Sequence, residues 1–343
     1  MDIDRYLQRN DPTWRRLEEL TKNGTRGAKR FSDDEVTELI ALYQRVSAQL
    51  SHARTQYADP ALNARLSQLL GAARNIIYQQ RRGSFRTILR FFSETFPAAV
   101  WVSRRFIAVA AICFLVPAIG MGFWLANSPT ALDASVPPEL QRLIAEHEFS
   151  DYYSSDAAQN FAGTVTINNI QVAFLAFALG IVILLGPAWI LASNGMHIGV
   201  MAAVMHNAGE GAQFWGLILP HGLLEISSIL VAGAAGLRLS WAVVAPGDRT
   251  RAKAFADEGM RAVVIVIGLA VCFIVAGFIE GFVTPSSMPT ALRIAVGVGV
   301  LVAFVAYIVL LGSSAERRGL TGKFGEERRE DHELVDVTGA LLP

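Results

Sequence analysis

The stretch from Pro220 to Trp241 constrains the fold of this chain more than any other part of it. It holds 22 mostly apolar residues, and at about 1.5 Å of rise per residue a helix of this length crosses a lipid bilayer. Pro220 suits the first turn of a helix, where its missing N–H leaves no hydrogen bond unmade. We therefore predict a membrane-spanning helix that begins at Pro220.

Two ionisable residues stand at the start of this span. His221 and Glu225 are four residues apart and so share one face of a helix. Because an unsatisfied polar group in hydrocarbon is costly, we expect the pair to be buried and hydrogen-bonded to each other in the outer third of the membrane. Further along the span, Gly233 and Gly236 are small enough to let a neighbouring helix approach closely.

The composition is typical of a membrane protein. Of 343 residues, 52% are hydrophobic and 17% are charged, against roughly a quarter charged in soluble domains. The predicted fold class is all-α: a polytopic helical membrane protein with an N-terminal soluble helical region. The formal net charge of zero excludes an overall basic binder of polyanions, so no nucleic acid is expected as a partner.

Cys113 and Cys272 fall in apolar stretches and are predicted to be buried thiols. The first apolar run starts near Phe106, so no signal peptide is expected.

Residues 1–83 are predicted to form a cytoplasmic bundle of two or three helices. Ser32, with a Glu three residues later, is typical of a capped helix start, and Pro60 marks a second start. Residues 84–105 carry apolar side chains on one face and charged ones on the other. That pattern predicts an amphipathic helix in the membrane interface, and a core helix of the soluble bundle is the alternative.

A transmembrane domain is predicted over residues 106–312, with an external loop over 127–167 and a cytoplasmic, disordered tail over 313–343. Segment 193–219 is ambiguous, because its short apolar run is followed by the break Asn207-Ala208-Gly209-Glu210-Gly211. The other spans are expected at 106–126, 170–192, 220–241, 262–279 and 294–312.

The distribution of Lys and Arg decides whether segment 193–219 crosses the membrane. There are 18 of these residues before Phe106, one in the loop 127–167 against six acids, four in 246–261 and five after Gly312. Basic loops stay on the cytoplasmic side, and all of them do so only if 193–219 crosses once, as a short or broken helix. We therefore predict about six crossings of the cytoplasmic (inner) membrane, with both termini cytoplasmic.

Broken helices at membrane depth line cavities or are buried in protein, and transporters build binding sites from them. His206 and Glu210, beside the break, therefore have two interpretations: members of such a site, or solvated groups of a connector at the outer surface. Glu280 and Arg293 lie at span ends and are expected to extend outward to water.

His221 and Glu225 do not follow the His-Glu-x-x-His order of zinc proteases, and no third ligand accompanies them in the sequence. The sequence contains no Ser nucleophile elbow, no phosphate-binding loop of the Walker type and no dinucleotide-binding fingerprint. We therefore predict a non-enzymatic protein with no catalytic residues, no metal and no cofactor.

Three stretches together carry a family pattern: AGTVTINNIQVAFLAFALG at 162–180, the pair Asn194-Gly195, and LPHGLLEISSILVAGAAGLRL at 219–239. They resemble the stage II sporulation protein M family of integral membrane proteins, in the long form found in non-sporulating bacteria. The similarity is clearest over residues 160–245. The polar positions that the resemblance marks are Asn168, Asn169, Asn194, His221 and Glu225, and the marked glycines, expected in helix packing, are Gly195, Gly222, Gly233 and Gly236.

Two of these polar elements have a local interpretation. Asn168 and Asn169 are expected either to cap the second span or to form an interhelical hydrogen bond near the outer surface. The pair Asn194-Gly195 is expected to form a tight reversal between the second and third spans.

The resemblance implies a non-enzymatic scaffold that organises the membrane or the cell envelope. In spore formers, the family member acts in engulfment as a membrane scaffold for cell-wall hydrolases. The expected partners are membrane lipids, envelope proteins and further copies of the chain. The residues also leave open a transporter or channel for a small solute or for protons, with the polar cluster around His221 and Glu225 as its site.

Overall fold

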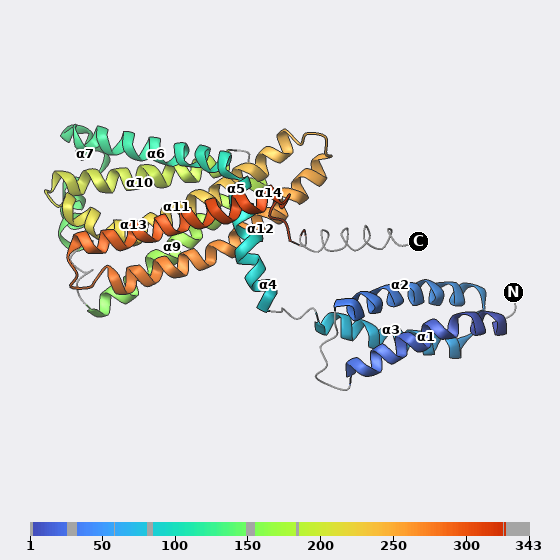
Figure 1. The fold of residues 1–343 in the computed structure, drawn as a ribbon. Helices are drawn as coiled ribbons and strands as arrows, with labels where there is room; N and C mark the ends of the chain where they lie inside the picture. The colour runs from blue at the N-terminus through green and yellow to red at the C-terminus, as the bar shows by residue number, and fades with distance from the viewer. Residues whose placement is uncertain are drawn as a thin grey trace. The chain divides into compact units, whose positions relative to one another are not determined.

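The computed structural model describes residues 3–25, 33–57, 59–80, 85–148, 155–182, 185–324 and 326. The chain divides into two compact units, Met1–Leu89 and Arg90–Pro343. Within the described residues every regular element is a helix, most of them α and a few short segments π. The prediction of an all-α polytopic membrane protein with soluble N-terminal helices is confirmed (Figure 1).

The first unit contains three helices around a core of its own. These are α1 (Ile3–Thr25), α2 (Asp33–Gln56) and α3 (Pro60–Gln80). Trp14 is fully buried at the centre, and its indole Nε1 donates to Gln49 Oε1 over 2.7 Å. Helix α3 begins at Pro60, as predicted, and the Asp59 carboxylate caps it by accepting from the N–H of Ala61 over 2.8 Å. Ser32 lies outside the described residues.

The boundary between the units falls at the end of the short helix α4 (Phe85–Arg90), and the second unit opens with the π-helix η1 (Phe91–Thr95) and α5 (Phe96–Val102). The Phe96 side chain is buried and lies against Gly268 in the long helix α12, where a Cβ atom would come within 2.0 Å of its ring. Residues 91–100 are therefore core of the second unit and not of the soluble bundle. That α4 lies along the membrane surface remains a prediction.

Six long helices lie side by side in this unit (Figure 1). They are α6 (Arg104–Ala126), α9 (Ser155–Val182), α10 (Gly186–Asn207), α11 (Gly211–Val244), α12 (Arg251–Phe278) and α13 (Thr290–Tyr307). Three shorter helices continue the last two: η4 (Ile279–Val283) extends α12, while η5 (Ile308–Gly312) and α14 (Ser313–Arg317) extend α13. Among the described residues, five of these helices are long and apolar enough to cross a membrane, and α9 contributes the shorter apolar segment Ile167–Ile181.

Helix α11 is the centre of the bundle. In its most apolar window 67% of the residues are buried, against 11% in α6 and in α13. On α6, large apolar side chains such as Ile112, Ile119 and Phe123 are more than half exposed, as expected of a surface that faces lipid. Polar side chains on α11 are therefore enclosed by neighbouring helices.

The helix boundaries correct three predictions about the middle of the chain. Segment 193–219 is not a span of its own, because it consists of the second half of α10, the turn at 208–210 and the start of α11, and Asn194-Gly195 lies inside α10 instead of forming a reversal. The chain turns later, through Ala208–Glu210, where Gly209 has a φ of +82°. Helix α11 then begins at Gly211, and Pro220 lies within it. A proline inside a membrane helix is tolerated because neighbouring helices satisfy the freed backbone.

Glycines lie where the long helices meet. A Cβ atom on Gly195 would come within 2.2 Å of the Phe114 carbonyl oxygen in α6, and one on Gly236 within 2.4 Å of the Ala176 oxygen in α9. At Gly233 the neighbour is the Leu191 side chain at 2.8 Å, and at Gly222 only Ile218 of the same helix, at 3.0 Å. Gly195 and Gly236 thus permit backbone-to-backbone contact.

The segment predicted as an external loop, 127–167, contains regular structure. After α6 come α7 (Pro129–Ser135), α8 (Pro138–Leu143) and η2 (Ile144–Glu148), and α9 already begins at Ser155. Leu132 and Ile144 are buried in a cluster with Met205 and Phe214. This cluster closes the end of the bundle at which α10 passes into α11 (Figure 1).

Candidate functional site

The candidate site is a group of polar side chains buried in the half of the bundle that contains the α10–α11 turn. His221 and Glu225 lie one turn apart on α11 and are 4% and 3% exposed. The predicted burial is correct, but the predicted hydrogen bond between them is wrong. Each has its partners on other helices, because side chains that share one helix face point in parallel towards neighbouring elements.

His221 faces the end of α12 and its extension η4. Its Nδ1 lies 3.3 Å from the hydroxyl of Thr284, and its Nε2 lies 3.9 Å from the carboxylate of Glu280. The Thr284 hydroxyl also lies 3.3 Å from the Ile279 carbonyl oxygen, which can accept its proton. Both Glu280 and Thr284 are buried. The prediction that Glu280 extends outward to water is therefore wrong.

Glu225 faces α9. The amide Nδ2 of Asn169 donates to Glu225 Oε2, while Oε1 has no hydrogen-bond partner within the described part of the chain. Asn168, the next residue, is exposed. Because α9 begins at Ser155, neither asparagine caps a helix. The interhelical hydrogen bond, the alternative to capping, is present for Asn169.

Arg293, near the start of α13, completes the group. It is 6% exposed, so the prediction that it extends to water is also wrong. One guanidinium nitrogen donates to the Thr284 carbonyl oxygen and the other to the Thr290 hydroxyl over 3.0 Å. Its Nε–H has no partner among the described residues. The backbone and hydroxyl of Thr284 thereby join Arg293 to His221.

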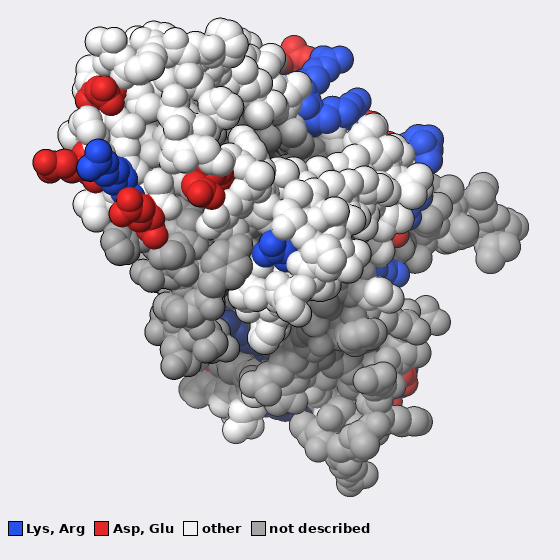
Figure 2. Space-filling view, turned by 90° about the vertical axis from the view of Figure 1, so that its left-hand side faces the viewer, with Lys and Arg blue, Asp and Glu red and all other residues white. Residues whose placement is uncertain are grey.

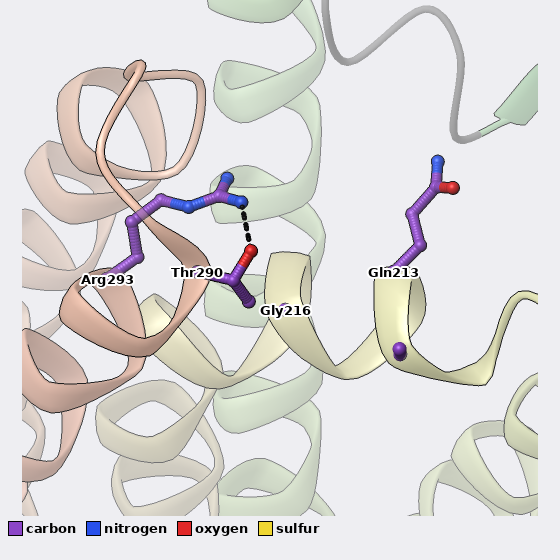
Figure 3. A pocket seen from close by; sticks show the side chains of 5 residues that line it. Gln213, Gly216, Thr290 and Arg293 are labelled. Carbon is purple, nitrogen blue, oxygen red and sulfur yellow. Dashed lines mark hydrogen bonds between the residues drawn. The ribbon is translucent and has the colours of Figure 1, made fainter.

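A pocket of about 520 Å³ lies beside Arg293 (Figure 3). Its lining residues come from the first turns of α11 and of α13: Ala212, Gln213, Gly216, Thr290 and Arg293. In Figure 3 the guanidinium of Arg293 extends over Thr290, with Gln213 on the opposite side. Figure 2 looks onto this end of the second unit and shows a surface that is mainly uncharged. The pocket therefore lies next to one member of the buried polar group, Arg293.

The remaining candidates lie elsewhere. Asn194 donates to the Ile190 carbonyl oxygen of its own helix over 2.8 Å. His206 and Glu210 are exposed beside the α10–α11 turn and lie outside the buried polar group. That they are solvated groups of a connector at the outer surface remains a prediction. Within the described residues, no group of three or more His, Cys, Asp and Glu side chains is arranged to hold a metal ion.

Glu280, Thr284 and Arg293 are members of the site that the sequence did not reveal. Their positions at span ends favour contact with water, and only the crossing of three helices brings them together. One feature of the sequence could have indicated them. No oppositely charged residue stands close to His221 and Glu225 on the rest of their span, and buried charges require partners from elsewhere.

A second polar group joins the opposite ends of α11 and α12. Arg238 donates from Nε to Glu258 over 2.7 Å and from Nη1 to the Val102 carbonyl oxygen over 2.7 Å. Arg261 also binds Glu258 and donates to the Thr321 carbonyl oxygen over 2.7 Å. These charges have direct partners, so the group fastens α5, α11, α12 and the segment after α14 to one another.

Fold and site together define a polytopic helical membrane protein with ionisable groups buried inside its bundle. Residues 110–285, more than half of the chain, match the family described as Stage II sporulation protein M. The chain therefore belongs to this family, as the sequence motifs predict. Residues 4–79 match a second family, described as a domain of unknown function (DUF8413).

Two proteins of Methanocaldococcus jannaschii are similar to part of the chain. The uncharacterized protein MJ0793 is 31% identical over 128 residues, which cover 37% of this chain and 71% of that protein. The uncharacterized protein MJ0706 is 27% identical over 123 residues, which cover 34% of this chain and 52% of that protein. No solved structure matches the chain.

Proposed function

We propose that the second unit is a non-enzymatic transporter in which His221, Glu225 and Glu280 exchange protons as a small solute passes. The burial of all three groups inside an apolar bundle is the observation that carries this proposal. Ionisable groups in membrane helices are costly, face the bundle interior and mark ion or proton pathways. Glu225 Oε1 is buried without a partner among the described residues, and a buried acceptor without a hydrogen bond destabilises the fold. A purely structural role does not explain why a carboxylate stands at this position.

The hydrogen bonds allow a proton to move between His221 and Glu280. If the Thr284 hydroxyl donates to Nδ1, the neutral imidazole carries its proton on Nε2, facing Glu280. If that hydroxyl donates to the Ile279 carbonyl oxygen, Nδ1–H faces Thr284, and Nε2 can accept a proton from Glu280. The transfer leaves Glu280 as a carboxylate beside an imidazolium that holds protons on both nitrogens, and the Thr284 hydroxyl oxygen accepts from Nδ1–H. The distance of 3.9 Å between Nε2 and the carboxylate requires a small approach or a water molecule.

The pocket beside Arg293 also supports transport. Towards the α10–α11 turn, the chain of contacts runs from His221 through Thr284 to Arg293 and the pocket. In the other direction, Gly236 on α11 lies against the α9 backbone, and Ser228 is fully buried. Alternating access requires a route to the site from each side of the membrane, and the pocket beside Arg293 is the expected start of one such route.

Proton flux into vesicles tests the proposal. Purified full-length protein is reconstituted with a pH-sensitive dye inside, and a pH gradient is imposed with and without small solutes. Wild type should carry protons faster than empty vesicles, and His221→Asn, Glu225→Gln and Glu280→Gln should each lose most of this flux, because amides do not exchange protons at these pH values. Glu210→Gln, at an exposed site, is the matched control. Flux that is equal in all variants would contradict the proposal.

An envelope scaffold is the second candidate, and the separate first unit favours it. That unit has its own buried core and its own family match, so it can bind a partner independently of the bundle. A scaffold engages membrane lipids, envelope proteins or further copies of the chain. Cross-linking in membranes tests this role. Proteins cross-linked to the first unit should be the same for wild type and for Glu225→Gln, and the absence of any cross-linked protein would exclude the role.

A further inference from the structure

We infer that the pocket at the start of α11 and α13 binds a small monocarboxylate, with Arg293 as its principal ligand. The guanidinium lies at the pocket wall, 6% exposed, and its Nε–H is buried without a partner. A buried donor without an acceptor is destabilising, and a ligand oxygen would satisfy it. The planar guanidinium matches the geometry of a carboxylate.

Two helix starts add to the positive potential of this pocket. Gln213 and Gly216 lie in the first turns of α11, and Thr290 is the first residue of α13. The unpaired N–H groups at helix starts carry partial positive charge and favour anions. On the side opposite Arg293, the amide of Gln213 supplies a further donor (Figure 3).

The neighbouring charges limit the ligand to a single negative charge. Glu280 lies one turn before Thr284, to which Arg293 donates, and it offsets part of the positive charge. Glu210, exposed just before α11, also disfavours a polyanion. The volume of about 520 Å³ lies within the range of small-molecule sites. A carboxylate with a short organic portion therefore fits better than phosphate.

The close contact of α11 with α13 forms the wall on which Thr290 lies. A Cβ atom on Gly216 would come within 2.7 Å of the Thr290 methyl group, and one on Gly297 within 2.5 Å of the Pro220 carbonyl oxygen. The close approach of Gly216 to the Thr290 methyl group therefore holds two of the lining residues against each other.

Thermal unfolding of the purified full-length protein tests the inference, with sodium acetate, sodium lactate, sodium phosphate and sodium chloride at equal ionic strength. Acetate or lactate should raise the Tm saturably, since a ligand that binds only the folded state stabilises it. The half-saturating concentration should rise at least tenfold in Arg293→Gln and several-fold in Gln213→Leu. Gln213 is half-buried, so its variant reports binding even if Arg293→Gln does not fold. Arg142→Gln, which removes an exposed charge from α8, should match wild type.

Equal Tm shifts for all four salts, or an equal response of wild type and Gln213→Leu, would overturn the inference. That the pocket binds a transported substrate rests on the proposed function, whereas that it binds a carboxylate does not. Proton flux without stabilisation by carboxylates would show that monocarboxylates are not the ligand and would leave the transport proposal unaffected. Stabilisation without flux would leave the binding site in place and remove transport.

Discussion

Glu225 and Asn169 form the contact on which the α9 side of the site depends. Their two helices approach closely, and the amide donates to a carboxylate that is 3% exposed. The other side of the site is built differently, because His221 reaches a hydroxyl and a carboxylate contributed by the end of α12. Each half of the site can therefore be tested separately by a residue that belongs to it alone.

Asn169→Ala should lower the stability of the folded protein. The change removes the one hydrogen bond to Glu225 among the described residues and leaves a buried carboxylate without it, which costs about 1–3 kcal/mol. Asn168→Ala, at the exposed neighbouring position, should have little effect. Thermal unfolding in detergent measures both. Equal Tm values for the two variants would show that the Asn169 contact does not stabilise the bundle.

Sequence reasoning identified half of this site. The spacing of His221 and Glu225 on an apolar span predicts that both are buried on one helix face. It could not give their partners, since Glu280, Thr284 and Arg293 are brought near only by the crossing of α11 with η4 and α13. Glu280 and Arg293 also lie near Gly and Pro at span ends, where solvent contact is the usual outcome.

At the scale of the helices, proline and glycine predicted the helix boundaries poorly. Pro220 favours a helix start, yet α11 begins at Gly211, because the tight turn at Gly209 ends α10 first. Asn194-Gly195 has turn composition, yet Gly195 is needed inside α10 for contact with α6. The apolar runs, by contrast, predicted the first span and the last two well, since they reflect the membrane and not local backbone preference. The second span, predicted over 170–192, was wrong, because α9 ends at Val182 and α10 begins at Gly186.

Gly236→Ala should destabilise the bundle, whereas Gly281→Ala should be tolerated. A Cβ atom on Gly236 would come within 2.4 Å of the Ala176 carbonyl oxygen, which is backbone and cannot rotate away, while nothing lies within 4 Å at Gly281. Overpacking of this kind costs about 1–3 kcal/mol. The yield of monodisperse protein in detergent and its Tm measure the effect. If Gly236→Ala matched Gly281→Ala, helices α9 and α11 would have to be further apart than described.

At the scale of the whole molecule, the two units are independently built, and the first should fold alone. A fragment of residues 1–82 is expected to be monomeric and mainly helical by circular dichroism, because its core is internal. Random-coil spectra would contradict this. With about 80 residues its stability should be modest.

The ion pair of Arg16 with Glu38 should contribute to the pH dependence of this fragment. Arg16 donates to both oxygens of Glu38 over 2.8 Å, and this hydrogen bond lowers the pKa of Glu38. Stability from a lowered pKa is fully present above the unfolded value and is lost as the pH falls through the folded one. The difference in unfolding free energy between wild type and Glu38→Gln should thus be larger at pH 6 than at pH 3. The pair is exposed, so the difference in unfolding free energy is small. If this difference were the same at pH 6 and at pH 3, the ion pair would not contribute to the pH dependence.

The orientation of the second unit is predicted from the distribution of basic residues. We expect the unit to lie in the cytoplasmic membrane with both termini cytoplasmic, because Lys and Arg concentrate before α6, between α11 and α12 and after α13. Reporter fusions after residues 130, 250 and 335 should report outside, inside and inside. An external signal at 250 would contradict the orientation.

The most direct test of proton exchange is the pH dependence with which an apolar carbodiimide modifies Glu225 and Glu280 in native membranes. This reagent reacts with protonated carboxyl groups, and peptide mass spectrometry locates the adducts. The account predicts modification of at least one of the two buried carboxyls, rising as the pH falls and reduced by acetate or lactate in the pocket. If neither carboxyl reacted at any pH while both peptides were recovered, the buried group would not exchange protons, and the transport proposal would be contradicted.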